Sequence, residues 1–470
     1  MKKLLLYINV IALMIITTDV WGQKESNIWY FGNHAGLDFN SGSPVAITNG
    51  GMMTYDNASA ICDSAGNLLF YTDGQMVWNA NHQIMSNGVN IGGSTTGGQA
   101  AVIVKKPLSN SIYYIFTSDG FGASGGLEYS IVDMSLLGGL GEVTQLGTLL
   151  QIPSTEKLAG IHTCTEKFTW LITHRGNSNE FCSYKITHNG LDTVPVVSAI
   201  GTFIQAGPYG VVNSTAGQMS LSKDGSKLAS VNYQSGTVEI FDFNVASGHI
   251  TNQILLTNTY LHAWGVEFSA DASKLYLSVY NSPSILQFDL NSGNATTITG
   301  SEISIGNISG TYCPGFSGAT GYLQRGPDDK IYLAKCGSTY ISVINSPNDA
   351  GTLCGFVDNG IYLNSKVSTF GLSRSIAHEC ESTGLKSVDK NELFSVTPNP
   401  SNGSFSINFS ENNFRGIRVL KIFNSMGEVV YFEKVDNSET KNVSTNLAAG
   451  IYTLELNLDN QSVFKKIVVY

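Results

Sequence analysis

Three related segments decide the fold: Ser222-Lys-Asp-Gly-Ser-Lys-Leu-Ala229, Ser269-Ala-Asp-Ala-Ser-Lys-Leu-Tyr276 and Gly326-Pro-Asp-Asp-Lys-Ile-Tyr332. Each is a polar turn with an Asp at its third position that leads into a strand rich in apolar residues. A second short apolar run follows each of them, at 240–243, 286–290 and 341–344. Weaker copies of the pattern precede them, at 63–78, 108–116 and 165–174. Successive copies lie roughly 45 to 58 residues apart, which is the spacing of a four-stranded repeat.

A four-stranded sheet cannot bury both of its faces alone, so such sheets stack around an axis until the ring closes. The six copies therefore predict an all-β chain whose larger domain is a β-propeller of seven blades, with six or eight as alternatives. The strands at 28–31 and 36–39 and the segment from Gly360 onward make no complete unit. We expect the two ends to share one blade, because this closure removes exposed sheet edges.

Composition agrees with many short strands and narrows the class of partner. The chain has 50 Gly, 21 Tyr and 22 Phe, and only 13 % of its residues are charged. These values suit strands joined by tight turns. The net charge of -10 comes with no basic patch, which argues against a nucleic-acid partner.

The chain divides into four parts. Residues 1–22 predict a signal peptide, because Met1-Lys-Lys3 is basic, Leu4 to Ile16 is apolar, and Val20-Trp-Gly22 suits cleavage. An uncleaved N-terminal anchor is the alternative. The propeller is expected at 23–380, a polar linker at 381–393, and a small C-terminal β-sandwich at 394–470, where alternation in 452–458 predicts a half-buried strand.

The Ser-x-Asp-Gly-Ser-Lys-Leu turns resemble those of YVTN and WD40-like propellers. The wider run, including 27–33, 66–74 and 265–269, is similar to propellers of secreted Bacteroidetes surface proteins. This resemblance implies the architecture, and implies little about activity.

The tail resembles the type A C-terminal sorting domain of the type IX secretion system. Its matching segments are Thr397-Pro-Asn-Pro400, Ile422-Phe-Asn-Ser-Met-Gly427, Leu447-Ala-Ala-Gly-Ile-Tyr-Thr453 and Lys465-Lys-Ile-Val-Val469. The motif residues are Pro398, Asn399, Pro400, Gly403, Gly427, Gly450, Tyr452, Lys465 and Lys466. The resemblance implies export to the cell surface or medium, with the secretion machinery and a surface sortase as partners and attachment to anionic lipopolysaccharide as an option. The alternative is a stalk or carbohydrate-binding sandwich that stays attached.

Polar side chains of the innermost strands are the first candidates for a ligand site, because these strands line the channel of a propeller. The candidates are His262, Trp264, Glu267, Gln324 and Arg325, with Gln218 and Ser220 beside them. An Arg guanidinium can bind a carboxylate or phosphate with two hydrogen bonds, and a Trp ring offers a flat face to a sugar. A Glu carboxylate can act as a general base. The alternative is a water-filled channel with polar walls.

A second polar group is His162, His174 and Arg175, which flank one strand. Imidazoles can bind metals or act as bases, but no third ligand has a supporting spacing, so we predict no metal site and no cofactor. Ser124, in a Gly-x-Ser-x-Gly match, is expected in a hairpin loop rather than at a nucleophile elbow. The Asp residues of the turns, at 224, 271 and 328, are expected to cap those turns.

The seven cysteines allow several pairings in an exported chain. Cys164 with Cys182, and Cys336 with Cys354, have spacings that suit pairs across neighbouring strands. Cys313 and Cys380 could then link the last blades, which leaves Cys62 unpaired.

These features favour a secreted or surface-displayed binding protein whose ligand is a glycan or another protein. Enzyme activity stays undecided, because no catalytic set is assembled in the sequence. One alternative is a propeller hydrolase, lactonase-like or glycan-active, that uses channel residues. Another is a structural protein of adhesion or gliding-associated surface assembly.

Overall fold

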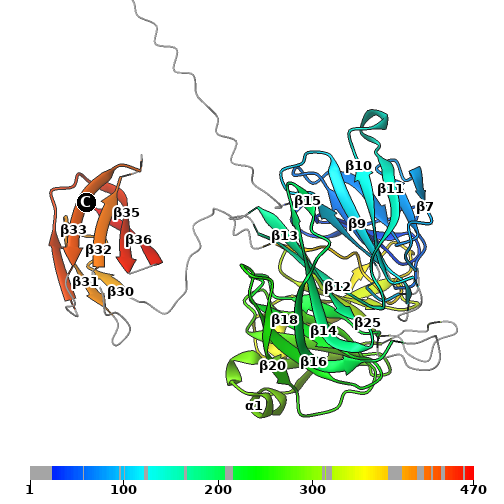
Figure 1. The fold of residues 1–470 in the computed structure, drawn as a ribbon. Coiled ribbons are helices and arrows are strands. Elements are labelled where there is room, and N and C mark those ends of the chain that lie inside the picture. The colour runs from blue at the N-terminus through cyan, green and yellow to red at the C-terminus, as the bar shows by residue number, and fades with distance from the viewer. Residues whose placement is uncertain are drawn as a thin grey trace, which may run out of the picture. The chain divides into compact units, whose positions relative to one another are not determined.

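The computed structural model describes residues 24–56, 58–94, 97–99, 101–120, 125–163, 167–206, 215–309, 313, 320–378, 394–409, 418–424, 427–435, 440–458 and 461–470. The chain forms two compact units, Met1–Ser382 and Thr383–Tyr470 (Figure 1). The predicted signal peptide, 1–22, and the predicted linker, 381–393, lie outside the described residues. None of the helices in the described ranges is long and apolar enough to cross a membrane.

In the described part of the first unit, the strands form seven consecutive groups, and the second and third of these are joined into one eight-stranded sheet by a parallel pair, Ser86 with Glu142. The first three groups are β1–β3 (Ile28–Phe31, Ala35–Asp38, Val45–Ile47), β4–β7 (Ser59–Cys62, Leu68–Thr72, Met76–Asn79, Ile84–Val89) and β8–β11 (Ala101–Lys105, Ile112–Ser118, Leu127–Asp133, Glu142–Gln151). The fourth is β12–β16 (Ser154–Thr163, Phe168–Arg175, Ser178–Thr187, Gly190–Leu191, Val196–Ile204). The last three are β17–β20 (Met219–Leu221, Lys227–Val231, Val238–Phe243, Ile250–Leu255), β21–β24 (Ala263–Phe268, Lys274–Val279, Ser284–Asp289, Ile303–Asn307) and β25–β28 (Thr320–Arg325, Ile331–Lys335, Tyr340–Ile344, Phe356–Tyr362).

Short helical elements and one late strand complete this unit. Helix α1 (Ala295–Gly300) lies between β23 and β24, and Asn294 caps its first turn. Single 3-10 turns are η2 (Leu137–Gly139), η3 (Leu290–Ser292) and η4 (Gly351–Cys354), and β29 (Ala377–His378) pairs with β12 in parallel.

Apolar side chains fill the space between each sheet and the next, so the seven groups form a closed ring. Val266 and Phe268 of the sixth group, for example, share a core with Val231 of the fifth. The last group also packs on the first, because the ring of Tyr332 meets Trp29 and Phe39, each at 5.5 Å between centroids. The predicted propeller is confirmed, with seven blades in the described residues.

The repeated Asp residues act in their turns, as predicted for two of the three. Asp224 accepts hydrogen bonds from the Ser222 hydroxyl and the Ser226 amide, at 2.6 and 3.1 Å. Asp271 makes the equivalent bonds in the next turn. Gly225 follows Asp224 with a φ of 71°, which glycine adopts without strain. Asp328 differs, because it accepts the Tyr332 hydroxyl at 2.7 Å.

Closure of the ring differs from the expected shared blade. Residues 360–362 belong to β28, whose Ile361 and Tyr362 pair with β27, so they complete the seventh blade. The following segment touches the first blade through a bridge between Asn33 and Val367 and through Asn364, whose Nδ2 donates to the Ala46 carbonyl of β3 at 3.2 Å. It then leaves the sheet edge for the axis of the ring.

The second unit is a two-sheet sandwich, which confirms the predicted fold of the tail. One sheet has the order β30 (Phe394–Thr397), β31 (Ser404–Phe409), β34 (Thr440–Ser444), and the other has β33 (Val429–Val435), β32 (Arg418–Phe423), β35 (Gly450–Leu458), β36 (Gln461–Val469). The core between them is made of Phe405, Ile407, Leu420, Ile422, Val443, Leu454, Leu456 and Ile467.

Candidate functional site

The end of the propeller chain runs along the middle of the ring, where an open channel was expected. We name residues 367–378 the axial segment. Its backbone meets β25 through the Tyr322 amide and Phe370 carbonyl, at 2.8 Å, and meets β4 through the Arg374 amide and Ala58 carbonyl, at 2.7 Å. Its last residues pair with β12. The segment is buried over 368–374 and therefore fills much of the axis.

Two side chains reach across the axis to the same backbone unit in β17. Gln99 donates from Nε2 to the Met219 carbonyl at 2.9 Å and accepts the Met219 amide at 2.7 Å. Arg374 donates from Nη2 to the same carbonyl at 3.3 Å. The axis is thus held by specific polar contacts rather than by solvent alone.

Four buried polar residues gather beside these contacts, and we name Asp56, Glu156, Tyr322 and Arg374 the axial polar cluster. Glu156 accepts the Gly98 amide at 2.7 Å. A Cβ on Gly98 would lie 1.8 Å from the Tyr322 hydroxyl, so this hydroxyl lies directly against a residue that must be glycine. Each residue of the cluster is at most 9 % exposed.

Burial and mutual repulsion determine the ionisation of this cluster. Burial raises the pKa of Asp56 well above its ordinary value, and the neighbouring Glu156 raises it further. Burial also raises the pKa of Tyr322, with Asp56 and Glu156 adding to the shift. The pKa of Arg374 falls to about 10 because the guanidinium is buried, while Glu267 opposes the change. At neutral pH the phenol and the guanidinium therefore keep their protons.

Several polar atoms at this site have no hydrogen-bond partner among the described residues. They are Asp56 Oδ1, Trp264 Nε1, Tyr322 Oη and Arg374 Nη1. A buried donor or acceptor without a partner costs about 1–3 kcal/mol. They are four of fourteen such atoms among the described residues, and each of them needs an explanation.

Aromatic rings stand next to the unpaired atoms, and we name Tyr233, His262, Trp264 and Tyr280 the aromatic wall. Trp264 stacks on Tyr322 with 4.9 Å between centroids and 19° between planes. The rings of Tyr233 and His262 lie 4.7 Å apart, and both residues are half-buried. His262 is held by Asn281, whose Nδ2 donates to Nδ1 at 3.0 Å. The wall thus joins the buried cluster to half-buried rings.

The predicted channel residues separate into two groups along the strands. His262 and Trp264 lie in the aromatic wall, near the start of β21. Glu267 lies near its end, where it accepts the Ser220 hydroxyl at 2.8 Å and the Arg325 amide at 3.3 Å. Three residues along a strand correspond to about 10 Å, so the five candidates do not form one site.

The second group contributes to the fold, although Gln324 Oε1 and Arg325 Nη1 are buried without a hydrogen-bond partner among the described residues. Gln218 donates to the Leu323 carbonyl at 2.7 Å and accepts the Val266 amide at 3.0 Å, so one amide joins three blades. Gln324 donates to the Arg325 carbonyl at 3.2 Å. These contacts hold the inner strands in register.

The predicted group of His162, His174 and Arg175 is not brought together. His162 pairs with Thr169 at one end of the hairpin, whereas His174 lies beside Thr155 at the other, five residues along β13 or about 17 Å away. Burial lowers the pKa of His174 to about 3. Arg175 forms an ion pair with Glu180. The register of β12 on β13 therefore excludes a shared site.

Lysine 157 is fully buried on β12. Its ammonium donates to the carbonyls of Gly217, at 2.7 Å, and Val231. Burial lowers the pKa of Lys157 to about 7, and the carboxyls of Glu156 and Glu239 oppose this shift. The contacts assign Lys157 to joining the fourth blade to the fifth.

A small cavity lies at the other end of the axial segment, between β4, β8 and β12. It is lined by ten residues, among them Glu25, Lys105, His162 and Ser375. Its volume of about 10 Å³ suits about one water molecule. It cannot hold a ligand larger than that.

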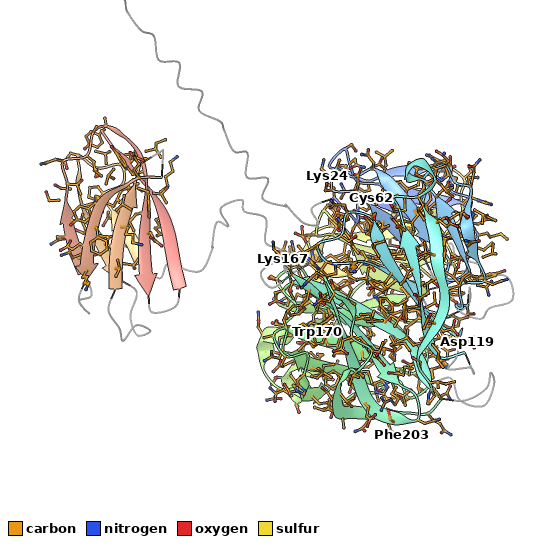
Figure 2. All side chains as sticks on the ribbon, turned by 45° about the horizontal axis from the view of Figure 1, so that its top comes forward. Lys24, Cys62, Asp119, Lys167, Trp170 and Phe203 are labelled. Atoms are coloured by element: carbon orange, nitrogen blue, oxygen red, sulfur yellow. A yellow bond between two sulfur atoms is a disulfide. The ribbon has the colours of Figure 1, made fainter. Side chains whose placement is uncertain are left out.

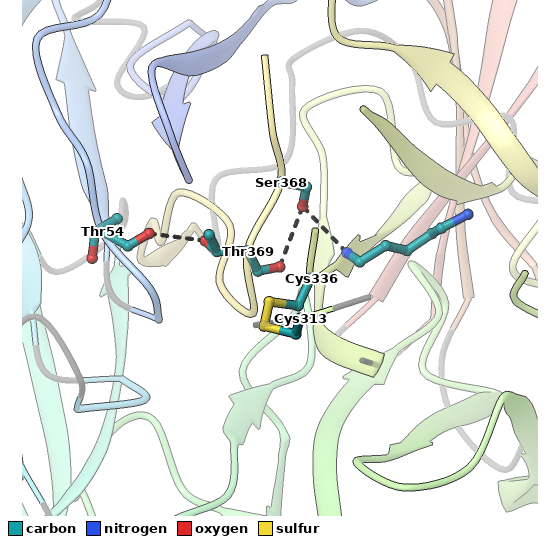
Figure 3. Close-up of a disulfide and its surroundings, with 6 residues drawn as sticks. Thr54, Cys313, Cys336, Ser368 and Thr369 are labelled. Atoms are coloured by element: carbon teal, nitrogen blue, oxygen red, sulfur yellow. Dashed lines mark hydrogen bonds between the residues drawn. A yellow bond between two sulfur atoms is a disulfide. The ribbon is translucent and has the colours of Figure 1, made fainter. Parts of the chain in front are cut away.

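The disulfides differ from the expected pairs. Cys313 is bonded to Cys336, with 5.2 Å between Cα atoms, beside the axial residues Ser368 and Thr369 (Figure 3). The pairing of Cys336 with Cys354 is therefore wrong, as is that of Cys313 with Cys380. Cys182 and Cys354 are free and buried, so Cys164 does not pair with Cys182. Cys164 and Cys380 lie outside the described residues.

Ser124 also lies outside the described residues. The strands on either side, β9 and β10, pair as an antiparallel hairpin from Ser118 and Leu127 onward. A strand followed by a helix, which a nucleophile elbow needs, is not the arrangement of these strands.

The tail motif joins the start of the second unit to its last strand. Asn399 donates to the Lys466 carbonyl at 2.8 Å and accepts the Val468 amide at 2.9 Å. Pro398 and Pro400 flank it, each after a cis peptide bond. These contacts cover the edge of β36, which would otherwise offer unpaired backbone groups.

The remaining motif residues lie in turns and on β35 and β36. Gly403 has a φ of 94°, and a Cβ there would meet the Thr445 carbonyl at 2.7 Å. Gly427 has a φ of 81° in the turn before β33. Gly450 begins β35, and the Tyr452 hydroxyl donates to the Ala448 carbonyl at 2.8 Å. Lys465 and Lys466 lie on β36.

Sequence analysis missed Asp56, Gln99, Glu156 and Arg374. Three positions before inner strands carry polar side chains that turn to the axis: Asp56 before β4, Gln99 before β8 and Gln218 before β17. A polar residue just before each inner strand was the available signal. The sequence contained no such signal for Arg374, because this residue lies outside the repeat.

Comparison with known proteins identifies the tail. Residues 395–470 match the family model described as "Secretion system C-terminal sorting domain". No curated protein matches the chain.

Among solved structures, the chain is similar to two putative 6-phosphogluconolactonases and to a β-propeller domain. The Bacteroides uniformis structure is 12 % identical, with 73 % of this chain and 98 % of that chain covered and a TM-score of 0.45. The Bacteroides fragilis structure is 13 % identical, with 75 % of this chain and 99 % of that chain covered and a TM-score of 0.45. The Cps50 (Swd1) β-propeller domain of Myceliophteria thermophila is 12 % identical, with 67 % of this chain and 94 % of that chain covered and a TM-score of 0.39. These values carry no argument about activity.

The sorting domain determines the destination of the chain. Domains of this kind mark proteins that the type IX secretion system exports, so the secretion machinery is a partner during export. The chain is thus an exported β-propeller protein of the cell surface or extracellular space, with its sorting domain at 395–470.

Proposed function

We propose that the exported propeller is a surface binding module that takes a ligand at the aromatic wall. The observation that supports this best is the combination of half-buried rings with four unpaired polar atoms beneath them. Binding sites commonly join apolar and aromatic walls to a few converging polar groups. A ligand that supplies the missing hydrogen bonds would recover the free energy lost by burying those atoms.

The test compares ligand binding by the exported chain and by His262→Ala. Glycan-array signal and thermal shift should be lost or strongly reduced in His262→Ala, because this ring forms the half-buried part of the wall. His249→Ala is the matched control, since His249 is an exposed histidine in a turn of the fifth blade. Equal binding by all three proteins would contradict a site at the wall. An absence of any binding would favour the structural role in adhesion.

A hydrolase is the second candidate, favoured by the neighbouring carboxyls of Asp56 and Glu156. Burial beside Glu156 raises the pKa of Asp56, and a carboxyl with a raised pKa can serve as a general acid. Asp56→Asn should then abolish hydrolysis of any glycan or lactone that the chain cleaves, while binding remains. Unchanged turnover would exclude this pair.

We also propose that the tail is of type A, that a surface sortase removes it, and that the mature propeller is attached to anionic lipopolysaccharide. The match over 395–470 and the resemblance of its motifs support this. Intact mass of the surface form should show a chain without residues 395–470, and without residues 1–22 if the predicted signal peptide is cleaved. A full-length surface form would contradict both processing steps.

A further inference from the structure

The two sheets of the sorting domain have outer faces of opposite character. On β31 and β34, every side chain that points away from the core is a hydroxyl or an amide: Ser404, Ser406, Asn408, Thr440, Asn442 and Ser444. These side chains bond to one another across the two strands, as in the bond from Ser406 Oγ to Asn442 Oδ1 at 2.7 Å. The outer face of the smaller sheet is therefore polar, as expected of a sheet face that meets water.

The outer face of the larger sheet carries apolar side chains along a diagonal. Phe432 of β33 lies opposite the residue of β32 that precedes Phe423 by two, so the two aromatic residues are diagonal neighbours on one face. By the same register Phe423 is a diagonal neighbour of Ile451 on β35. Ile451 lies opposite Val468 of β36. We name Phe423, Phe432, Ile451 and Val468 the diagonal stripe, which crosses all four strands of the sheet (Figure 1).

The diagonal stripe is not part of the core of the sandwich. Phe432 and Ile451 are 56 % and 58 % exposed, and Phe423 and Val468 are half-buried. The alternate residues of these strands point the other way and fill the core. Single exposed apolar side chains are common, but a contiguous exposed apolar row marks an interaction site.

The charges beside the stripe are compatible with burial against a partner. Lys421, which lies opposite Phe432, forms an ion pair with Glu455 on the next strand at 3.3 Å. A partner that covers this row would therefore bury a paired charge, which costs much less than an isolated one.

The family of the domain identifies the partner of this face. The secretion machinery is a partner of the sorting domain during export. The sorting domain begins at β30, which belongs to the smaller sheet, so the stripe lies on the sheet opposite the one that the chain enters. A partner can therefore hold the stripe without blocking the start of the domain.

We propose that the diagonal stripe is the surface by which the secretion machinery holds the sorting domain during export, and that it docks on an apolar protein surface of that machinery. This proposal concerns the second unit and does not depend on a ligand site in the propeller. It involves no covalent step.

Photocrosslinking in a host with a type IX secretion system tests the proposal on the full chain. Phe432→p-benzoylphenylalanine should crosslink to a component of the machinery, identified by mass spectrometry of the adduct. Ser406→p-benzoylphenylalanine is the matched control on the polar face and should not crosslink to it. Equal crosslinking from both positions would overturn the proposal, as would a crosslink from position 432 only to lipid or to the propeller of the same chain.

Export of a second pair of variants measures what the stripe contributes. Phe432→Ser combined with Ile451→Ser should lower the amount of chain at the surface about tenfold, because loss of a central apolar anchor commonly weakens an interface by this factor or more. Ser406→Ala combined with Asn442→Ala is the matched control and should be exported at the parent level. Substitutions of exposed residues leave stability nearly unchanged, which calorimetry of the purified full chains checks. The crosslinking result does not depend on the stability of these variants.

The export outcomes separate the machinery from other partners. Export of the stripe variant at the parent level would overturn the proposal. A stripe variant that reaches the surface but keeps residues 395–470 would assign the stripe to the surface sortase and would overturn it as well. Ligand binding by the propeller is measured separately, so its failure leaves this proposal in place.

Discussion

Replacing Phe370 by Ala tests whether the axial segment is part of the core. Phe370 is 1 % exposed, and its ring lies 5.3 Å from that of Tyr280. Truncation of a buried Phe costs about 3–5 kcal/mol. With an unfolding entropy of about 2.1 cal/mol/K per residue, a propeller of roughly 350 residues should lose about 4–7 °C in Tm.

Tryptophan fluorescence is the assay, because Trp29, Trp78, Trp170 and Trp264 lie in the propeller and the second unit contains no Trp. Phe203→Ala is the control, since Phe203 is 61 % exposed and is labelled at the edge of the propeller in Figure 2. Its Tm should change by less than about 1 °C, because surface substitutions stay within about 0.5 kcal/mol. If the Tm of Phe370→Ala also changed by less than about 1 °C, the buried position of the axial segment would be refuted.

Three further predictions concern other parts of the chain. The folded pKa of His174, about 3, lies below that of an unfolded His, so the unfolded chain alone binds this proton as pH falls below about 6.5. Stability should fall by about 1.4 kcal/mol per pH unit from there toward pH 4, and urea melts of His174→Phe should show a smaller fall. Replacing both Cys313 and Cys336 by Ser should lower the free energy of unfolding by about 3 kcal/mol, as expected for a loop of this length. Peptide mapping of the parent chain without reductant should find the disulfide. Alkylation of both thiols under these conditions would contradict the pairing. Asn399→Ala removes both hydrogen bonds to β36, so the free energy of unfolding of the sorting domain should fall by about 1–3 kcal/mol. Less protein should then reach the surface. Export at the parent level would exclude a role for this contact.

The repeat made the propeller predictable, because Asp224 and Asp271 stand in turns whose local chemistry is the same in each blade. The sandwich was predictable for a similar reason, since alternation along 452–458 reflects a strand with one buried face. These features depend on neighbours in the chain, which a sequence displays directly.

The centre of the ring could not be predicted in the same way. Arg374 meets the Met219 carbonyl at a separation of 155 residues, and the Ser59 hydroxyl meets the Arg374 carbonyl at 315. Such contacts leave no periodic signal. The pairing of Cys313 with Cys336 was missed because spacing across a hairpin does not show which cysteines face the axis.

The axial segment also orders events in time. Contacts between residues about 300 positions apart form late in folding, because the chain between them must first be organised. The core at the centre of the ring therefore cannot be completed until the axial segment, which is synthesised just before the sorting domain, is available. A chain cut short by a premature stop would lack both the last piece of its core and its export address. Incomplete propellers of this kind should stay inside the cell, so the order of the two segments in the sequence serves as a completeness check on what is displayed.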